Sequence, residues 1–324
     1  MFSTKVEPVT PTYQLSHSDN ILTLGSCFSE HIGKKLYERG FNVDVNPFGV
    51  LYNPVSVRNA LIDLLENRRF VETDLFFYHD LWNSFSHSSL FSDLSPEKTV
   101  ETINRRMETA CTLFRHVDRL LITFGTAWVY KSTATGQPVA NCHKLPSQHF
   151  VRYRLRVEDI VAAYRDVIPL LERQRPEVKV LFTVSPIRHL KDGAHENNIS
   201  KGVLLLAVDE LQKRFGNVDY FPAYEIMSDE LRDYRYYADD MLHLSATAID
   251  YIWEKFGDTY FSKTTKTIVS EIMSLKNDLN HKVRHPETNA HRIFLSQVEN
   301  KKRRLLEKYP FLNDRPVVWS PSDF

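Results

Sequence analysis

The amino-acid sequence predicts an α/β fold built on a parallel sheet. Two observations lead to this prediction. Short apolar runs typical of buried strands recur along the chain, and segments with helical periodicity separate them. Strands that alternate with helices in this way are joined by crossover connections, which make them parallel neighbours in one sheet. The expected strands are residues 21–25, 41–45, 119–125, 179–186 and 218–224.

The expected helices are indicated by apolar spacing and by the residues at their ends. Phe28, Ile32 and Leu36 recur every four residues, and Gly40 stands where a glycine commonly ends a helix. The Asn-Pro pair at 53–54 begins a second helix, with Asn as its N-cap and Pro in its first turn. Further helices are expected from Ser95-Pro96 to about Arg115, over 157–173, and over 199–215.

The remaining segments are expected to be less regular. Residues 74–95 are aromatic and Ser-rich and are predicted to form a long, structured loop, and a second loop region follows the third strand. From about Thr264 the pattern becomes helical and charged, which predicts a helical extension over 264–310. The predicted division is an α/β domain over 15–262 and a C-terminal helical extension over 263–324.

Composition excludes several classes of function. The chain of 324 residues has 41 basic and 41 acidic side chains, and this balance does not favour nucleic acid or an anionic membrane as a partner. No apolar run approaches the roughly 18 residues of a membrane span, and the first residues do not resemble a signal peptide. Three cysteines fit a reducing compartment, so we expect a cytoplasmic protein. The histidine spacings match no metal motif, and we expect neither metal nor cofactor.

Reactive side chains follow several expected strands. Ligands of parallel α/β sheets bind at the carboxyl ends of the strands. The loops at these ends read GSCF (25–28), NPFG (46–49), FGTAWVY (124–130) and SPIRH (185–189). A fifth stretch contains Asp240 and His243. Their spacing lets one tight turn place the carboxylate against the imidazole Nδ1, which leaves Nε2 free to accept a proton from a nucleophile.

The turn after the first strand offers two candidate nucleophiles, Ser26 and Cys27. The start of a helix favours an anionic nucleophile through the helix dipole and lowers the pKa of a thiol. Backbone N–H groups at this turn, together with one from the loop at Gly49, are the expected oxyanion donors.

These stretches together resemble the GSCFA-domain family, named for the motif that reads here Gly25-Ser26-Cys27-Phe28-Ser29. The other family-like stretches are NPFGVLYNP, HSSLFS, FGTAWVY, ANCHK, SPIRHLKDG and ADDMLHLS, and the resemblance covers roughly residues 15–260. The family is distantly similar to SGNH/GDSL hydrolases, which cleave acyl esters. The resemblance implies a flavodoxin-like, three-layer fold with sheet order 2-1-3-4-5.

The resemblance also implies roles for individual residues. The G-D-S motif of the hydrolases, laid on Gly25, puts the nucleophile at Cys27, with Ser26 as the second candidate. A similar G-N-C-Q turn in a family of capsular polysaccharide acyltransferases also has Cys there. His243 and Asp240 match the family's D-x-x-H block, and Gly49 matches the glycine of the second block. The implied substrate contacts are Arg188 and His189.

One family block departs from the hydrolase pattern. The hydrolases have G-x-N-D after the third strand, where this chain has Gly125-Thr126-Ala127-Trp128. The oxyanion-binding asparagine is therefore missing, and Asn141 is the nearest substitute along the chain. Loss of one oxyanion donor typically costs about 10²–10³ in rate.

The expected function is hydrolysis of an acyl ester, most simply deacetylation of a carbohydrate or a small-molecule ester. Two alternatives use the same residues or the same fold. One is an acyltransferase that moves an acyl group from coenzyme A to a sugar hydroxyl, since a thioester at Cys27 suits transfer as well as hydrolysis. The other is a non-catalytic module that binds a glycan or a protein partner.

Overall fold

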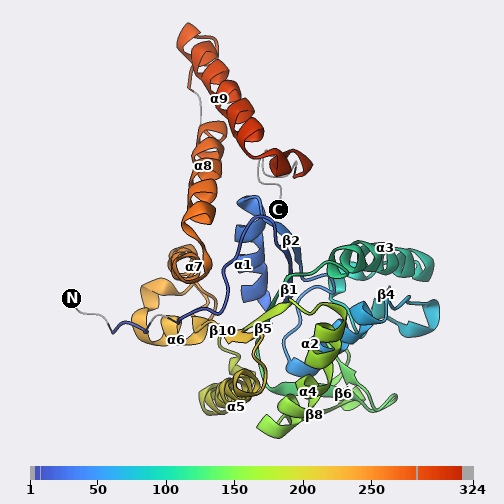
Figure 1. Ribbon diagram of the computed structural model, residues 1–324. Coiled ribbons are helices and arrows are strands. Elements are labelled where there is room, and N and C mark those ends of the chain that lie inside the picture. Colours follow the sequence, from blue (N-terminus) through green and yellow to red (C-terminus); the bar gives the residue numbers. More distant parts are fainter. Residues whose placement is uncertain (1–3, 8, 282–283, 316–324) are drawn as a thin grey trace.

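A five-stranded parallel sheet forms the centre of the computed structural model, which describes residues 4–7, 9–281 and 284–315 (Figure 1). The strand order is β2-β1-β5-β9-β10, with all neighbours parallel, which confirms the predicted order 2-1-3-4-5. The strands are β1 (Asn20–Gly25), β2 (Asn42–Val45), β5 (Arg119–Phe124), β9 (Lys179–Val184) and β10 (Val218–Tyr220).

Helices cover both faces of this sheet and make a three-layer fold. The helices on one face are α2 (Pro54–Leu65), α3 (Pro96–Phe114), α4 (Val157–Gln174) and α5 (Gly193–Arg214). The other face carries α1 (Cys27–Glu38) and α7 (Ala246–Tyr260), with the short α6 (Ala223–Glu225) beside them. Side chains along β1 point alternately to the two faces of the sheet. Leu22 therefore packs in the hydrophobic core on the α2–α5 side, and Ile21 packs in the core on the α1 and α7 side.

The predicted apolar stripe of α1 is the face that this helix buries. Phe28, Ile32 and Leu36 are all buried against the sheet and α7. Full burial of side chains of this size stabilises the fold by about 1.5–3 kcal/mol each. The stripe therefore fixes the rotation of α1 and, with it, the direction in which the first helical residue points.

Two predicted loop regions contain small antiparallel sheets, so the loop predictions were wrong there. Residues 74–95 include the hairpin β3 (Leu75–Tyr78) and β4 (Leu81–Ser84). The region after β5 forms a three-stranded sheet of β6 (Trp128–Ser132), β7 (Pro138–Val139) and β8 (Phe150–Arg154). These strands carry charged residues and lack a clean apolar pattern, because much of their packing is between arginine and aromatic side chains, as where Arg152 lies over the Trp128 ring.

The helix expected over 199–215 begins earlier, at Gly193. Its first turns are polar in sequence and have no apolar periodicity. Contacts with residues outside the helix stabilise these turns instead. Asn197 accepts a hydrogen bond from the His189 backbone, and Glu196 forms an ion pair with Arg154. Tertiary contacts thus extend this helix beyond the part that periodicity predicts.

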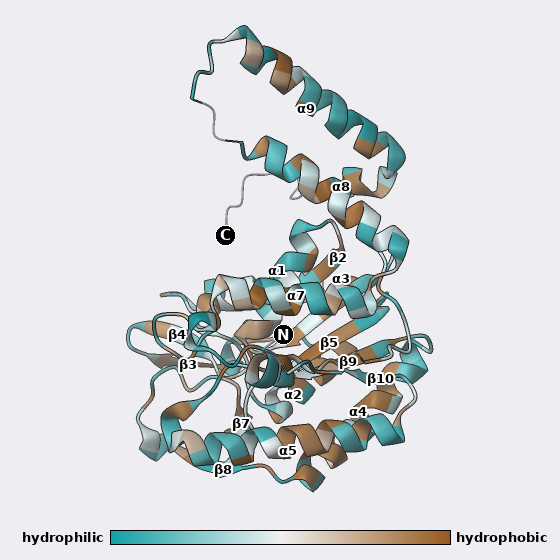
Figure 2. Cartoon of the chain, turned by 90° about the vertical axis from the view of Figure 1, so that its left-hand side faces the viewer, coloured by the Kyte–Doolittle hydropathy of each residue, from teal (hydrophilic) through white to brown (hydrophobic). Residues whose placement is uncertain are grey.

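The C-terminal helices α8 (Lys263–Leu279) and α9 (Asn289–Lys308) extend away from the sheet as an arm (Figure 1). They pack on each other through a small core that includes Ile272, Leu275 and Leu305. Their outer faces are largely hydrophilic (Figure 2). The predicted helical extension is therefore present, although its last residues, 316–324, lie outside the described residues. Within the described chain, every helix is too short or too polar to cross a bilayer.

A buried histidine makes the stability of this fold sensitive to acid. His87 is 1% exposed, stacks on Phe48 at 5.1 Å between ring centroids, and shares a hydrogen bond with Ser84 Oγ. Burial lowers the pKa of His87 to about 3. In the unfolded chain the His87 imidazole binds a proton near pH 6.5, whereas in the folded chain it stays neutral until about pH 3. The free energy of unfolding therefore falls as the pH falls below about 6.5.

We expect the free energy of unfolding to drop by about 2 to 3 kcal/mol between roughly pH 6.5 and 4.5 through His87 alone. Chemical denaturation at several pH values measures this slope. His87→Gln, which cannot titrate, should flatten it, whereas His285→Gln on the exposed α8–α9 connection should leave it unchanged. An equally steep slope in His87→Gln would show that other groups cause the acid sensitivity.

Candidate active site

The turn after β1 requires a glycine and begins α1 at Cys27. Gly25 has φ +143°, and a Cβ there would lie 2.2 Å from the carbonyl oxygen of Thr123 on β5. The Gly25 N–H donates to Asn46 Oδ1 at 3.0 Å, which ties the end of β1 to the end of β2. A side chain at Gly25 would push β1 and β5 apart, so the turn that places Cys27 depends on this residue.

The two candidate nucleophiles have different surroundings. Ser26 is the N-cap residue of α1, is fully buried, and its hydroxyl has no hydrogen-bond partner within the described structure. Cys27 is only partly buried. The N–H groups of Cys27 and Phe28 lie at the free start of the helix and act on the Cys27 sulfur. Of the two residues, Cys27 is the more exposed, and it is therefore the better candidate for contact with a ligand.

The environment of Cys27 raises the pKa of its thiol. Burial is the main cause, and the charge of Glu30, one turn further along α1, adds to it. The two backbone N–H groups and the ammonium of Lys201 act in the opposite direction but do not overcome burial. The sequence-based expectation of a lowered pKa at this helix start is therefore wrong. Cys27 rests as a thiol, and its use as a nucleophile requires a base.

Asp240 and His243 form the pair that their spacing predicts. His243 Nδ1 lies 2.5 Å from Asp240 Oδ2, while Asp240 Oδ1 accepts the backbone N–H groups of Leu242 and His243 at 2.9 Å each. The hydrogen bond from His243 and those from the backbone lower the pKa of Asp240 to about 2. The carboxylate thus stays ionised, fixes the ring, and directs Nε2 away from the turn.

His243 lies on an exposed segment between β10 and α7 and is close enough to His189 to lower the pKa of that residue. Within the described structure, no hydrogen bond joins His243 to the Cys27 sulfur. In sites without ligand, such bonds are often long and tighten only when the substrate is bound.

His189 lies next to Gly125, the first residue of the stretch that replaces the G-x-N-D motif of the hydrolases. Its Nε2 is buried, has no partner in the described part of the chain, and lies 3.3 Å from where a Cβ of Gly125 would be. Its ring meets the Tyr52 ring edge-on at 5.4 Å between centroids. Burial lowers the pKa of His189 to about 4, with Lys201 and His243 adding to this effect, so the ring is neutral at physiological pH.

Two other residues expected at the oxyanion are engaged in their own turns. Gly49 has φ +76° and its N–H donates to the Asn46 carbonyl at 2.7 Å, so this donor is not directed at a ligand. Asn141 uses its side-chain oxygen to accept the N–H of His143 two residues on. The predicted oxyanion role of Gly49 therefore does not fit its position. The role of Asn141 stays a prediction, because this hydrogen bond uses its oxygen and not its Nδ2 donors.

Arg188 lies in the SPIRH loop, four residues after the end of β9, and is partly buried. Its charge helps to lower the pKa of Lys201, so the two cations lie close together. Among the described residues, no carboxylate forms an ion pair with Arg188. The guanidinium is thus available to a polar group of a ligand.

Sequence reasoning missed Lys201, which is buried on α5 beside the site. A signal was present, because Asn197, Lys201, Leu204 and Val208 share one face of the helix and the other three are buried as well. A lysine within such a stripe needs a specific reason.

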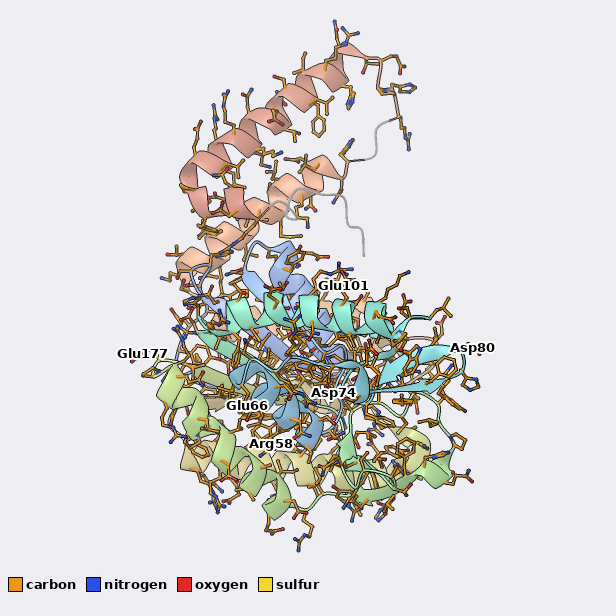
Figure 3. The ribbon with its side chains drawn as sticks, turned by 90° about the vertical axis from the view of Figure 1, so that its right-hand side faces the viewer. Arg58, Glu66, Asp74, Asp80, Glu101 and Glu177 are labelled. Carbon is orange, nitrogen blue, oxygen red and sulfur yellow. The ribbon has the colours of Figure 1, made fainter. Side chains whose placement is uncertain are left out.

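Within the described residues, no group of three or more histidine, cysteine or acidic side chains is arranged to hold a metal ion. A groove of about 640 Å³ lies elsewhere, between residues 67–72 and α3, and includes Glu101 (Figure 3). It contains none of the residues described above and has no catalytic arrangement.

The profile of the GSCFA family matches residues 20–256, which include the site from Cys27 to His243. The chain belongs to the GSCFA family. A second profile, that of the C-terminal domain of GSCFA domain proteins, matches residues 272–315, which include the second half of α8 and all of α9. The predicted boundary of the GSCFA domain near residue 262 remains a prediction. No curated protein matches the sequence.

Several solved structures resemble this GSCFA chain at low identity. A candidate platelet activating factor from Streptococcus pneumonia is 14% identical, with a TM-score of 0.37, 75% of this chain covered and 84% of the other. A carbohydrate esterase family 3 protein from Talaromyces cellulolyticus is 10% identical, with a TM-score of 0.35 and coverages of 77% and 98%. The acetyl xylan esterase Est2A from Butyrivibrio proteoclasticus is 12% identical, with a TM-score of 0.33 and coverages of 77% and 64%.

Proposed function

We propose that this GSCFA protein is an acyl-ester hydrolase that removes an acetyl or other small acyl group from a carbohydrate or small ester. Cys27 is the nucleophile, His243 the general base and Asp240 the residue that orients His243. The observation that carries the proposal is a partly exposed cysteine at a helix start together with an Asp–His pair whose Nε2 has no hydrogen-bond partner among the described residues. Such a site suits acyl transfer through a thioester.

The reaction runs in two halves. His243 Nε2 takes the proton of the Cys27 thiol as the sulfur attacks the carbonyl carbon of the ester. The tetrahedral intermediate collapses, the alcohol leaves with the proton held by His243, and the acyl group remains on the sulfur. Water then attacks the thioester, again with His243 as base, and the carboxylic acid and free thiol are released. The raised pKa of Cys27 is compatible with this scheme, because the thiol loses its proton during attack and not before.

His189 supplies the oxyanion donor that the missing asparagine leaves open. In a neutral ring, Nε2 carries a hydrogen when Nδ1 does not, and the unpaired, buried Nε2 next to Gly125 is then a directed donor. The Cys27 backbone N–H is the second donor. Neither one has to be reorganised at the moment of reaction.

His189→Ala is expected to lower kcat/KM by about 10²-fold, because one donor to the oxyanion is lost. His189→Gln, whose amide can donate from a similar position, should recover part of the rate. The matched control is His195→Ala on the exposed start of α5, which should retain full activity. If His189→Ala hydrolyses esters at the wild-type rate, the donor must come from another residue.

The function is tested with the purified chain, nitrophenyl acetate and acetylated xylo-oligosaccharides. We expect release of acetate and, in rapidly quenched samples, an acetyl group on the peptide that contains Cys27. Acetylation of a sugar in the presence of acetyl-coenzyme A, without acetate release from esters, would instead establish the acyltransferase. Sugar or partner binding without turnover of either donor would establish the non-catalytic module.

A further inference from the structure

Lys201 is a buried cation without an anionic partner. Its side chain is 1% exposed, and its ammonium donates to the carbonyl oxygens of Gly125 and Ser185, each at 2.7 Å. Among the described residues, no carboxylate forms an ion pair with it. The two carbonyls belong to the residues that directly follow β5 and β9, the strands that carry Gly125 and His189 to the site.

A buried lysine in this position destabilises the fold. Removing an ammonium from water without a counter-ion is strongly unfavourable, and two neutral carbonyls and the Tyr224 ring, 5.8 Å from the ammonium, compensate only in part. A methionine would fill a similar volume in the core at no such cost. The lysine is therefore better explained by what its charge and hydrogen bonds do at the site than by stability.

The charge of Lys201 acts on the groups around it. It lowers the pKa of the Cys27 thiol and that of the His189 imidazole, while the negative charge of a Cys27 thiolate raises the pKa of Lys201. Burial and the neighbouring Arg188 oppose this and hold the pKa of Lys201 at about 7. Glu30 on α1 also acts on Cys27 and favours the neutral thiol. The Tyr52 phenol lies close enough for the charge of a Cys27 thiolate to raise its pKa.

We propose that Lys201 is a positioning residue of the active site, which bridges the ends of β5 and β9 and holds a positive charge close to the Cys27 sulfur. This inference rests on the proposed role of Cys27. The charge stabilises the sulfur when it carries negative charge, both as it attacks and when it leaves the thioester. The same charge adds to the burial that keeps His189 neutral, as an Nε2–H donor requires.

The test measures the thiol directly and needs no substrate. The full chain and its Lys201→Met variant are alkylated with iodoacetamide over a range of pH, and the rate at each cysteine is read from peptide mass spectra. In Lys201→Met we expect Cys27 to react about tenfold more slowly near pH 6, where Lys201 is charged in the wild type, which corresponds to a rise of about one unit in the pKa of the thiol. The difference should shrink above pH 7, where Lys201 loses its proton. Cys142, which is influenced by Lys191 and Arg152, is the reference within the same chain and should be unaffected.

Two further variants separate charge from folding. Lys201→Gln is neutral but can still donate to the two carbonyls, so it should fold and should show the same slowing at Cys27. Lys213→Met removes an exposed lysine from the same helix and should match the wild type. An unchanged Cys27 profile in a folded Lys201→Met or Lys201→Gln variant would overturn the inference.

The inference and the proposed function fail in different ways. If Cys27→Ala still hydrolyses esters, the proposed function is wrong, whatever Lys201 does to the thiol. If Cys27 is essential but its reactivity does not depend on Lys201, only the role of Lys201 is wrong.

Discussion

Cys27→Ala is expected to lower kcat/KM for ester hydrolysis by on the order of 10⁴ or more, because no covalent intermediate can then form. Substrate binding should be nearly unchanged, since the backbone donors and His189 remain in place. The measurement is steady-state hydrolysis of nitrophenyl acetate by the purified variant, together with a thermal unfolding curve to show that the chain is folded.

Two controls make this result specific. Cys142→Ala removes another partly buried thiol and should leave activity unchanged. Ser26→Ala removes a hydroxyl that is fully buried and has no partner in the described structure, so activity should stay near the wild-type level. The opposite pattern, with activity lost in Ser26→Ala and kept in Cys27→Ala, would move the nucleophile to Ser26.

His243→Asn should have the second-largest effect, a loss of about 10³-fold or more in kcat. The Cys27 thiol has a raised pKa, so it depends on a base to remove its proton during attack. Asp240→Asn should also lower kcat by about 10²-fold or more, because the ring loses the carboxylate that selects its tautomer. Both values come from single-turnover kinetics, which separate chemistry from binding.

The matched control for His243 is His285→Asn. His285 is also exposed and also close to a carboxylate, with its Nδ1 3.6 Å from Glu287, but it lies on the α8–α9 connection. It should retain full activity. A double variant, His243→Asn with Cys27→Ala, should be no slower than Cys27→Ala alone, because the two residues act in one step. Clearly additive losses would mean that His243 has a role independent of the nucleophile.

Much of the central fold could be predicted because it depends on local pattern. β1, β5 and β9 are buried on both faces and read as short apolar runs, and the end signals of α1 and α2 lie within a few residues of each helix. The small sheets could not be predicted in the same way. β6 and β8 contain charged side chains that pack on aromatic rings of the neighbouring strand. These contacts form only when the two strands pair, so the sequence of either strand does not reveal them.

In the candidate site, too, features set by nearby residues could be predicted and features set by distant segments could not. The Asp240–His243 pair was predictable, because both residues lie in one tight turn. The occupied N–H of Gly49 was not, since it depends on how its loop closes on Asn46. The approach of His189 to Gly125 joins the ends of two strands that are about 60 residues apart along the chain, a separation over which spacing carries no information.

The sequence by itself determined where the main strands lie along the chain, the start of α1 at Cys27 and the Asp–His turn, because each of these is specified within a few residues. Only the tertiary structure decided that Ser26 is buried while Cys27 is partly exposed, that Lys201 has no counter-ion among the described residues, and that the thiol pKa is raised. Those features come from burial and from charges brought together by distant segments. Their energies depend on how far each group is removed from water, which is a property of the packed molecule.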